Sequence, residues 1–274
     1  MQDKADYDIV IAGGGLVGGA LALALAQLQC RVALIEAVLP DNAAQPSFDD
    51  RTIALSYGSC RILRALGLWE YLENNVWPIQ QIHVSEQKRF GTAVIDSDEQ
   101  GVPQLGYVIK SRQIGIALWQ RLRELDQVSL ICPASVTATR IVEQQREISL
   151  SGEAGTRAVN AKLLVVADGA RSKLRAALDI AVENRDYDQV AVVANIQIDP
   201  RKAGHIAFER FTPDCPLALL PGSDSCYSVV LARSGATAAD VMGMDETDFL
   251  RVVQAEFGFR LGRLSRASER MSYP

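Results

Sequence analysis

The chain has 274 residues and a formal net charge of −5, the difference between 28 basic and 33 acidic side chains. Hydrophobic residues make up 48% of it and charged residues 22%, which is ordinary for a globular protein and excludes a disordered or fibrous chain. Lys and Arg supply most of the affinity for nucleic acid by neutralising phosphates, so an acidic chain without a basic cluster is not expected to bind it. The length suits one large domain or two of ordinary size.

The cysteines and histidines give no sign of a metal centre. Five cysteines are scattered along the chain without a C-x-x-C pair, and the two histidines, His83 and His205, lie far apart in sequence. This pattern predicts reduced thiols, as in a cytoplasmic protein, and neither a disulfide framework nor a zinc site.

Residues 9–26 carry no charge, and 18 such residues are enough for a membrane-spanning helix. Five of them are glycines, three of them consecutive at Gly13 to Gly15, and glycine destabilises a helix. The preceding residues are mostly acidic, which is the wrong sign for a signal peptide. We therefore expect a turn here, no membrane span, and a cytoplasmic protein.

A strand pattern, a glycine turn and a helix pattern follow one another in this stretch. The β-branched residues 7–12 are typical of a buried parallel strand, and the Ala- and Leu-rich residues 20–26 favour a helix. Between them stands Gly13-x-Gly15-x-x-Gly18, which in this context predicts a dinucleotide-binding turn. Gly13 would permit the bend, Gly15 would let a pyrophosphate approach the backbone, and Gly18 would let helix and strand pack closely. The pyrophosphate would rest on free N–H groups at the helix start.

Glu36 ends the next expected strand, residues 31–35, and lies 18 residues after Gly18. At this spacing a carboxylate meets the adenosine ribose, and it disfavours the 2′-phosphate of NADP. The motif therefore predicts NAD or FAD and does not decide between them. The chain has neither a second G-x-G nor a redox cysteine pair, which excludes a two-domain disulfide reductase.

Two further segments are open to two interpretations from the residues alone. Asp168 and Gly169 follow another buried strand pattern. They would either border a ligand at the carboxyl end of the sheet or form a common turn in which Asp168 or Ser172 caps the next helix. Arg51 follows a Pro- and Asn-containing loop, residues 39–48, and precedes an expected helix. It would either clamp a phosphate or stand in solvent.

Taken together, these segments carry a resemblance. The glycine turn is followed in order by Asp50-Arg51-x-x-Ala54-Leu55, Ala167-Asp168-Gly169-x-x-Ser172 and a segment at 211–221 that contains Pro-Leu-Ala-Leu-Leu-Pro. The chain thereby resembles, over essentially its whole length, the ubiquinone-biosynthesis hydroxylases, within the aromatic flavin monooxygenases that include p-hydroxybenzoate hydroxylase. Residues 207–212 and 257–262 most resemble the branch that acts on 2-polyprenyl-6-methoxyphenol.

The resemblance implies an α/β fold, in which a Rossmann-like FAD-binding domain of the p-hydroxybenzoate hydroxylase type is joined to a mixed β-sheet substrate domain. FAD would be the resident cofactor and NAD(P)H a transient co-substrate. The residues that match FAD-binding positions are Gly13, Gly15 and Gly18 under the pyrophosphate, Glu36 on the ribose, and Arg51, Arg112, Asp168 and Gly169, of which the last two also serve NAD(P)H.

The implied reaction is a monooxygenation in which one oxygen atom of dioxygen passes to the ring of a polyprenyl phenol, on the route to ubiquinone. Because such a substrate lies in the bilayer, the resemblance also implies peripheral association with the inner membrane. A ubiquinone-biosynthesis protein complex is a further partner that the resemblance implies. Two other classes stay open: a flavin oxidase or dehydrogenase with the same FAD fold, and a catalytically incomplete assembly subunit.

The chain departs from the family in two places. Cys215 stands before Pro216 where the family usually has glycine, so the turn there is expected to differ. Relatives continue past position 274 into a third FAD motif, so we expect an N-terminal portion with an incomplete FAD-binding domain.

The expected domains are an FAD-binding domain at 1–78 and 106–180 and a substrate domain at 79–105 and 181–274. Strands are expected at 192–196, 207–211 and 227–231. A helix capped by Asp245 is expected to place Phe249, Val253 and Phe257 in the core.

Overall fold

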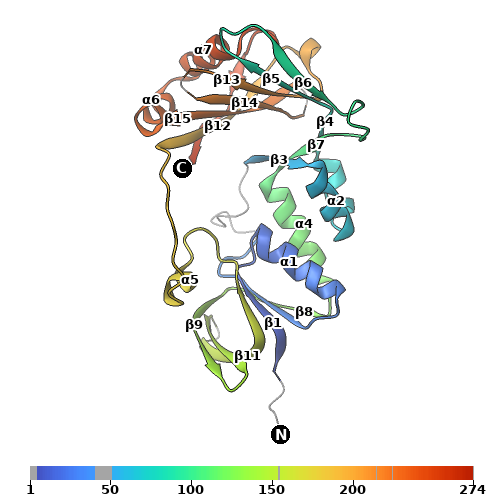
Figure 1. The fold of residues 1–274 in the computed structure, drawn as a ribbon, viewed down its shortest axis with the longest axis vertical. Helices are drawn as coiled ribbons and strands as arrows, with labels where there is room; N and C mark the ends of the chain where they lie inside the picture. Colours follow the sequence, from blue (N-terminus) through green and yellow to red (C-terminus); the bar gives the residue numbers. More distant parts are fainter. Residues whose placement is uncertain (1–4, 41–50, 154, 214, 224, 274) are drawn as a thin grey trace. The chain divides into compact units, whose positions relative to one another are not determined.

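The computed structural model describes residues 5–40, 51–153, 155–213, 215–223 and 225–273 (Figure 1). Most of the loop predicted at 39–48, Asp50 and Pro274 lie outside these residues. The chain forms two compact units, one of residues 1–50, 62–74 and 110–183 and the other of residues 51–61, 75–109 and 184–274. The assignment of FAD and substrate binding to separate domains stays a prediction.

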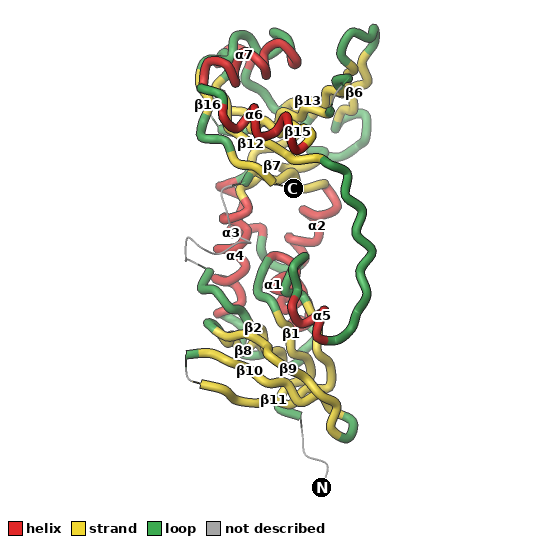
Figure 2. Tube along the Cα trace, turned by 90° about the vertical axis from the view of Figure 1, so that its left-hand side faces the viewer, coloured by secondary structure: helices red, strands yellow, loops and turns green. Residues whose placement is uncertain are grey.

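The first unit is built on a six-stranded sheet in the order β8-β2-β1-β11-β10-β9. The first four of these strands run parallel, whereas β10 and β9 form an antiparallel hairpin with the first half of β11. Figure 2 shows the strands of this sheet in yellow. The elements of this unit are β1 (Tyr7–Ala12), α1 (Leu16–Gln27), β2 (Val32–Ile35), α3 (Trp69–Leu72), a 3-10 turn (Glu73–Asn75), α4 (Ser111–Arg123), β8 (Val128–Ile131), β9 (Ala134–Val142), β10 (Gln145–Gly152), β11 (Gly155–Val166) and α5 (Lys173–Ala177).

The strand, turn and helix predicted at 7–26 are confirmed, and the second predicted strand begins one residue late, at Val32. Helix α1 packs on α4 through Gly19, where an added Cβ would lie 3.6 Å from the side chain of Leu118. Small residues on α1 thus bring the two helices close together.

Asp8, in β1, ties together three segments of this sheet. Its carboxylate accepts a hydrogen bond from the backbone N–H of Arg31 at 2.9 Å and pairs with the ammonium of Lys162, in β11, at 2.8 Å. The hydrogen bond from Lys162, and next that from Arg31, hold the pKa of Asp8 well below its ordinary range. The carboxylate therefore stabilises the folded state while it is ionised.

We expect Asp8→Asn to lower the free energy of unfolding at pH 7 by about 1 kcal/mol, because the amide keeps one acceptor but loses the charge. Since folding depresses this pKa, the contribution is present above the unfolded value near 3.8 and disappears as the pH falls below it. Urea unfolding at neutral and acid pH measures this, with Glu147→Gln, in the exposed pair with Arg140, as the control. An equal loss for Asp8→Asn at both pH values would contradict the assignment.

The second unit is built on an eight-stranded sheet in the order β16-β12-β15-β14-β13-β5-β6, with β17 also paired to β12, and on a three-stranded sheet β3-β7-β4. Its elements are β3 (Thr52–Ser56), α2 (Tyr57–Ala65), which runs across the unit boundary, β4 (Trp77–Ile79), β5 (Gln81–Glu86), β6 (Thr92–Asp96), β7 (Gly106–Lys110), β12 (Gln189–Gln197), a 3-10 turn (Pro200–Lys202), β13 (Ile206–Phe211), β14 (Pro216–Pro221), β15 (Cys226–Ser234), α6 (Gly235–Gly243), α7 (Glu246–Phe257), β16 (Arg266–Ala267) and β17 (Met271–Tyr273).

Helix α7 covers one face of this sheet, as its sequence pattern predicts. The Asp245 carboxylate accepts a hydrogen bond from the backbone N–H of Asp248 at 2.8 Å, which confirms the predicted cap. Phe249, Val253 and Phe257 are buried in the same cluster as the inward residues of β12, β14 and β15, so their predicted core role is confirmed. The strands predicted at 192–196, 207–211 and 227–231 are also confirmed.

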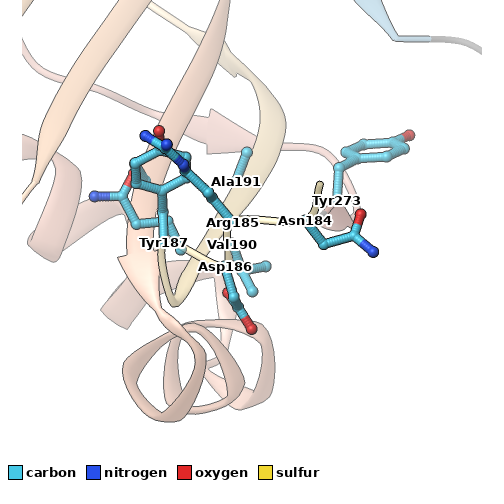
Figure 3. Close-up of a pocket in the computed structure, with 9 residues that line it drawn as sticks. Asn184, Arg185, Asp186, Tyr187, Val190, Ala191 and Tyr273 are labelled. Carbon is cyan, nitrogen blue, oxygen red and sulfur yellow. The ribbon is translucent and has the colours of Figure 1, made fainter. Parts of the chain in front are cut away.

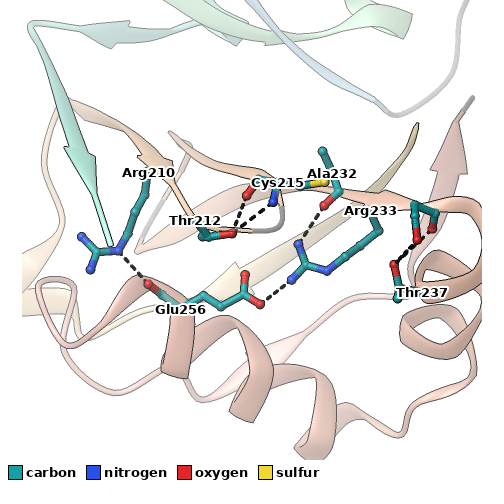
Figure 4. A network of polar contacts seen from close by, with 8 residues as sticks. Arg210, Thr212, Cys215, Ala232, Arg233, Thr237 and Glu256 are labelled. Carbon is teal, nitrogen blue, oxygen red and sulfur yellow. Dashed lines mark hydrogen bonds and ion pairs between the residues drawn. The ribbon is translucent and has the colours of Figure 1, made fainter. Parts of the chain in front are cut away.

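The turn before Pro216 is closed by a threonine hydroxyl. Thr212 Oγ1 donates to the carbonyl of Cys215 at 2.7 Å and accepts from its N–H at 3.2 Å (Figure 4). Cys215 does not have a positive φ. The family's usual glycine is therefore not required here by backbone conformation.

Within the residues that the structure describes, no helix is both long enough and apolar enough to cross a membrane.

Candidate functional site

The carboxyl ends of three parallel strands meet at one edge of the first unit's sheet. Strand β1 lies between β2 and β11, with Ala12 aligned with Ile35 on one side and Val166 on the other. The backbone continues this alignment beyond the strands, since Gly13 N–H donates to Ile35 and Ala167 N–H donates to Ala12, each at 2.8 Å. The glycine turn, Glu36 and Asp168 therefore start from the same sheet edge, which is where ligands bind in open α/β sheets.

Gly13 and Gly18 are required by the geometry of the turn. Gly13 has a φ of +107°, and an added Cβ would lie 2.3 Å from the carbonyl oxygen of Ala167. A Cβ on Gly18 would lie only 1.9 Å from the carbonyl oxygen of Gly13. These two contacts agree with the bending and packing roles predicted from the sequence.

Gly15 stands just before α1 with φ −68° and ψ −169°, an extended conformation that other residues also adopt. No side chain caps the helix. The first N–H groups of an α-helix have no partner within the helix, and their dipoles favour an anion. The predicted approach of a pyrophosphate at Gly15 fits this arrangement and stays a prediction.

Glu36 reaches directly to the glycine turn. One oxygen of its carboxylate accepts the N–H of Gly14 at 2.6 Å, and the other accepts the N–H of Val38 at 3.0 Å. The carboxylate predicted to bind a ribose thus stands at the mouth of the turn and also holds its backbone. The hydrogen bond joins Gly14 and Glu36, which are 22 residues apart in sequence, and so brings the glycine turn and the carboxylate of the predicted motif together.

Trp119 is a part of this site that the sequence analysis missed. Its indole N–H donates to the carbonyl of Gly14 at 3.0 Å, across 105 residues of sequence. A Cβ on Gly14 would lie 2.8 Å from the Trp119 ring, so the ring packs directly on the turn. Helical spacing from Ile114 through Leu118 to Leu122 does place Trp119 on the buried face of α4, but no local pattern indicates its contact with the turn.

Asp168 and Gly169 follow β11 and are exposed. Gly169 has a φ of +87° with nothing within 4 Å of an added Cβ, so it is required for the turn's conformation and not for packing. The cap of α5 is Ser172, whose hydroxyl accepts the N–H of Arg175 at 2.9 Å. Of the two capping residues considered, Ser172 fills the role, which leaves Asp168 exposed at the sheet edge.

The two predicted arginines lie in different places. Arg112 is the second residue of α4, about 10 Å along the helix from Trp119 at 1.5 Å per residue. Arg51 belongs to the second unit, where its guanidinium lies 4.5 Å from the ring centroid of Tyr273. It leads into strand β3 and not directly into a helix as expected, because Thr52–Ser56 pair in the three-stranded sheet before α2 begins.

A pocket of about 570 Å³ lies within the second unit (Figure 3). Tyr273 lines it, together with residues 184–187 and 189–191 and Ala232. Through Tyr273 it lies next to Arg51. The other residues predicted to bind FAD are in the first unit and do not line it.

The comparisons with known proteins agree with this geometry. Residues 6–240 match the model of the FAD binding domain. The chain belongs to this family. The expected cofactor, FAD, is therefore the cofactor of this fold, and the choice between NAD and FAD that the motif left open is decided.

This chain is similar in sequence to ubiquinone-biosynthesis hydroxylases. It is 32% identical to 3-demethoxyubiquinol 3-hydroxylase of Escherichia coli over 265 residues, 93% of this chain and 64% of that protein. It is 31% identical to ubiquinone hydroxylase UbiL of Rhodospirillum rubrum, over 97% of this chain and 61% of that protein. The chain thus spans less than two thirds of the length of either relative.

Solved structures confirm the predicted fold. PqsL of Pseudomonas aeruginosa superposes with a TM-score of 0.78 at 18% identity, covering 98% of this chain and 73% of that one. The p-nitrophenol 4-monooxygenase PnpA of Pseudomonas putida gives 0.74 at 18% identity, covering 97% and 67%. This chain therefore has the α/β fold of the p-hydroxybenzoate hydroxylase type.

Proposed function

We propose that this chain forms part of an FAD-dependent monooxygenase that hydroxylates a polyprenyl phenol, 2-polyprenyl-6-methoxyphenol, in ubiquinone biosynthesis. The observation that supports the proposal most directly is the hydrogen bond from the Gly14 N–H to the Glu36 carboxylate. It joins the glycine turn to Glu36 at the carboxyl ends of the parallel strands β1 and β2. The relatives that match over 93% and 97% of the chain support the substrate class.

FAD fits the residues present. No side chain caps the first N–H groups of α1, which can therefore donate to the pyrophosphate of FAD. At Gly13 and Gly18 the turn is too tightly packed to hold a side chain. We propose that Gly13, Gly15 and Gly18 hold the pyrophosphate and that Glu36 binds the ribose. Further FAD contacts are proposed for Arg51 and Arg112, and contacts to both FAD and transient NAD(P)H for Asp168 and Gly169.

When bound, FAD accepts a hydride from NAD(P)H and activates dioxygen, which is chemistry that amino-acid side chains do not supply. The protein's own residues would bind and orient the cofactor: Glu36 accepts the N–H of Gly14 and Trp119 donates to its carbonyl, and both contacts fix the backbone of the glycine turn. In the proposed overall reaction the phenol, dioxygen, NAD(P)H and one proton give the hydroxylated phenol, water and NAD(P)+.

The test is NAD(P)H oxidation by the complete polypeptide with FAD, in the presence and absence of a short-chain prenylated methoxyphenol. We expect the phenol to stimulate NAD(P)H oxidation and one atom of ¹⁸O₂ to appear in the product ring. Oxidation of an amine or alcohol without NAD(P)H would favour the flavin oxidase or dehydrogenase. FAD binding without any turnover would favour the assembly subunit. Either result would overturn the proposal.

Peripheral association with the inner membrane and membership of a ubiquinone-biosynthesis complex are parts of the same proposal. The membrane association is supported by the chemistry of the substrate, whose isoprenoid tail partitions into a bilayer.

A further inference from the structure

The turn between β5 and β6 exposes an aromatic side chain between cationic neighbours and a glycine. Phe90 is fully exposed, at 108% of its reference surface, and follows Lys88 and Arg89. Lys88 and Gly91 both have positive φ, at +61° and +100°, as a tight turn requires. A single exposed apolar residue is ordinary, so the meaning of Phe90 depends on what surrounds it.

Two more exposed aromatic side chains lie on the elements next to this turn. Gln87 N–H donates to the carbonyl of Phe211, the last residue of β13, at 2.7 Å, and Phe211 is 48% exposed. Its side chain lies on the face of the sheet away from α7, because Phe208, three residues earlier in β13, packs on Phe257 of α7. Phe259, two residues beyond α7, is 71% exposed. Strands β5, β6 and β13 and helix α7, labelled in Figure 1, all belong to the second unit.

Arg260 joins Phe259 to the same hairpin. Its guanidinium lies 2.7 Å from the ring of His83, in β5, and His83 is aligned with Val94 of β6, itself 48% exposed. We call this surface the hairpin edge and define it by the residues Lys88, Arg89, Phe90, Phe259 and Arg260.

The hairpin edge is positively charged although the whole chain is negative. Arg89 pairs with Glu86 at 3.4 Å, whereas Arg260 contacts the His83 ring and Lys88 adds a further charge. Burial, and next the charge of Arg260, lower the pKa of His83, which favours a neutral ring beside Arg260.

A further arginine, Arg210 in β13, contacts α7, and among the residues that the structure describes no carboxylate forms an ion pair with it. Its Nε donates to the backbone carbonyl of Glu256 at 2.7 Å, while the carboxylate of Glu256 pairs with Arg233 (Figure 4). Burial, and next the nearby charge of Arg260, lower the pKa of Arg210. The cations at this edge thus repel one another, and an external anion would relieve that repulsion.

We infer that the hairpin edge binds the surface of a membrane that contains acidic phospholipids, with Phe90 and Phe259 entering the interface and Lys88, Arg89 and Arg260 facing lipid phosphates. Aromatic rings favour the headgroup level of a bilayer, and basic residues are drawn to acidic lipids. The Phe90 ring projects from the turn beside two cations, and this shape and charge suit an acidic bilayer better than they suit a flat surface of another protein. The inference rests on the proposed membrane association and names the surface that would make it. Binding needs neither flavin nor substrate, so its failure is distinguishable from failure of the proposed reaction.

Sedimentation with vesicles tests this. We expect the chain to pellet with vesicles of phosphatidylcholine and phosphatidylglycerol, and much less with phosphatidylcholine alone or at high salt. Phe90→Ser should weaken binding about tenfold, and the double variant Lys88→Ser with Arg89→Ser should abolish the preference for acidic vesicles. The matched control is Ile141→Ser, an exposed apolar residue, 66% exposed, in the β9–β10 hairpin of the other unit. It should bind like the wild type.

A second measurement does not rely on loss of binding. Phe90→Trp should show a blue shift of its fluorescence when acidic vesicles are added. The inference is overturned if the wild type stays in the supernatant with acidic vesicles, or if the Phe90 and Lys88/Arg89 variants bind as tightly as Ile141→Ser. It is also overturned if these variants instead abolish a dimer seen by gel filtration while vesicle binding is absent.

Discussion

Replacing Gly18 with alanine is expected to destabilise the first unit strongly, whereas the same change at Gly19 is expected to leave its stability intact. The two glycines are neighbours in α1 and both are buried. A Cβ on Gly18 would lie 1.9 Å from the carbonyl oxygen of Gly13, which no real contact allows. A Cβ on Gly19 would meet the Leu118 side chain at 3.6 Å, an ordinary van der Waals contact.

The two variants are expected to differ clearly in their free energy of unfolding. Gly18→Ala must push α1 away from the turn and should cost about 3 kcal/mol or more. Gly19→Ala should be neutral or stabilising by up to about 1 kcal/mol, because alanine has the higher helix propensity. Urea unfolding of both variants beside the wild type measures this. Equal midpoints for the two alanine variants would mean that the turn is not packed as described.

This pair also shows what the sequence could predict. The strand before Gly13, the helix after Gly15 and the roles of Gly13 and Gly18 follow from local patterns, because a β-branched run, a glycine turn and an alanine-rich helix each have a short-range cause. The spacing from Gly18 to Glu36 correctly indicated that the carboxylate would stand beside the turn. Local sequence does not show that the carboxylate binds the Gly14 N–H.

What could not be predicted depends on contacts between distant residues. Trp119 reaches Gly14 across 105 residues, and only the packing of α4 on α1 brings them together. The β9–β10 hairpin was not predicted either, since much of β9 is exposed and its pairing with β10 shifts register near Ser149 and Leu150. Strand β3, which follows Arg51, is fixed by pairing in the three-stranded sheet and not by its own five residues.

Glu36→Ala is expected to weaken FAD binding about 10- to 100-fold, the range that corresponds to losing one charged hydrogen bond. The change would remove the proposed ribose partner and the carboxylate that accepts the N–H groups of Gly14 and Val38. Glu36→Gln keeps one acceptor oxygen and nearly the same shape, so its affinity should fall between those of the wild type and the alanine variant. Titration of FAD, followed by quenching of its fluorescence, measures the dissociation constants.

The control for this comparison is Glu147→Ala, because Glu147 is a carboxylate of the same unit that pairs with exposed Arg140 on the β9–β10 hairpin, away from the turn. Its FAD affinity should equal that of the wild type. Circular dichroism at the titration temperature distinguishes loss of affinity from loss of fold, since Glu36→Ala also removes support from the turn. A folded Glu36→Ala variant with wild-type affinity would mean that the carboxylate serves the turn alone, and that the ribose is bound elsewhere.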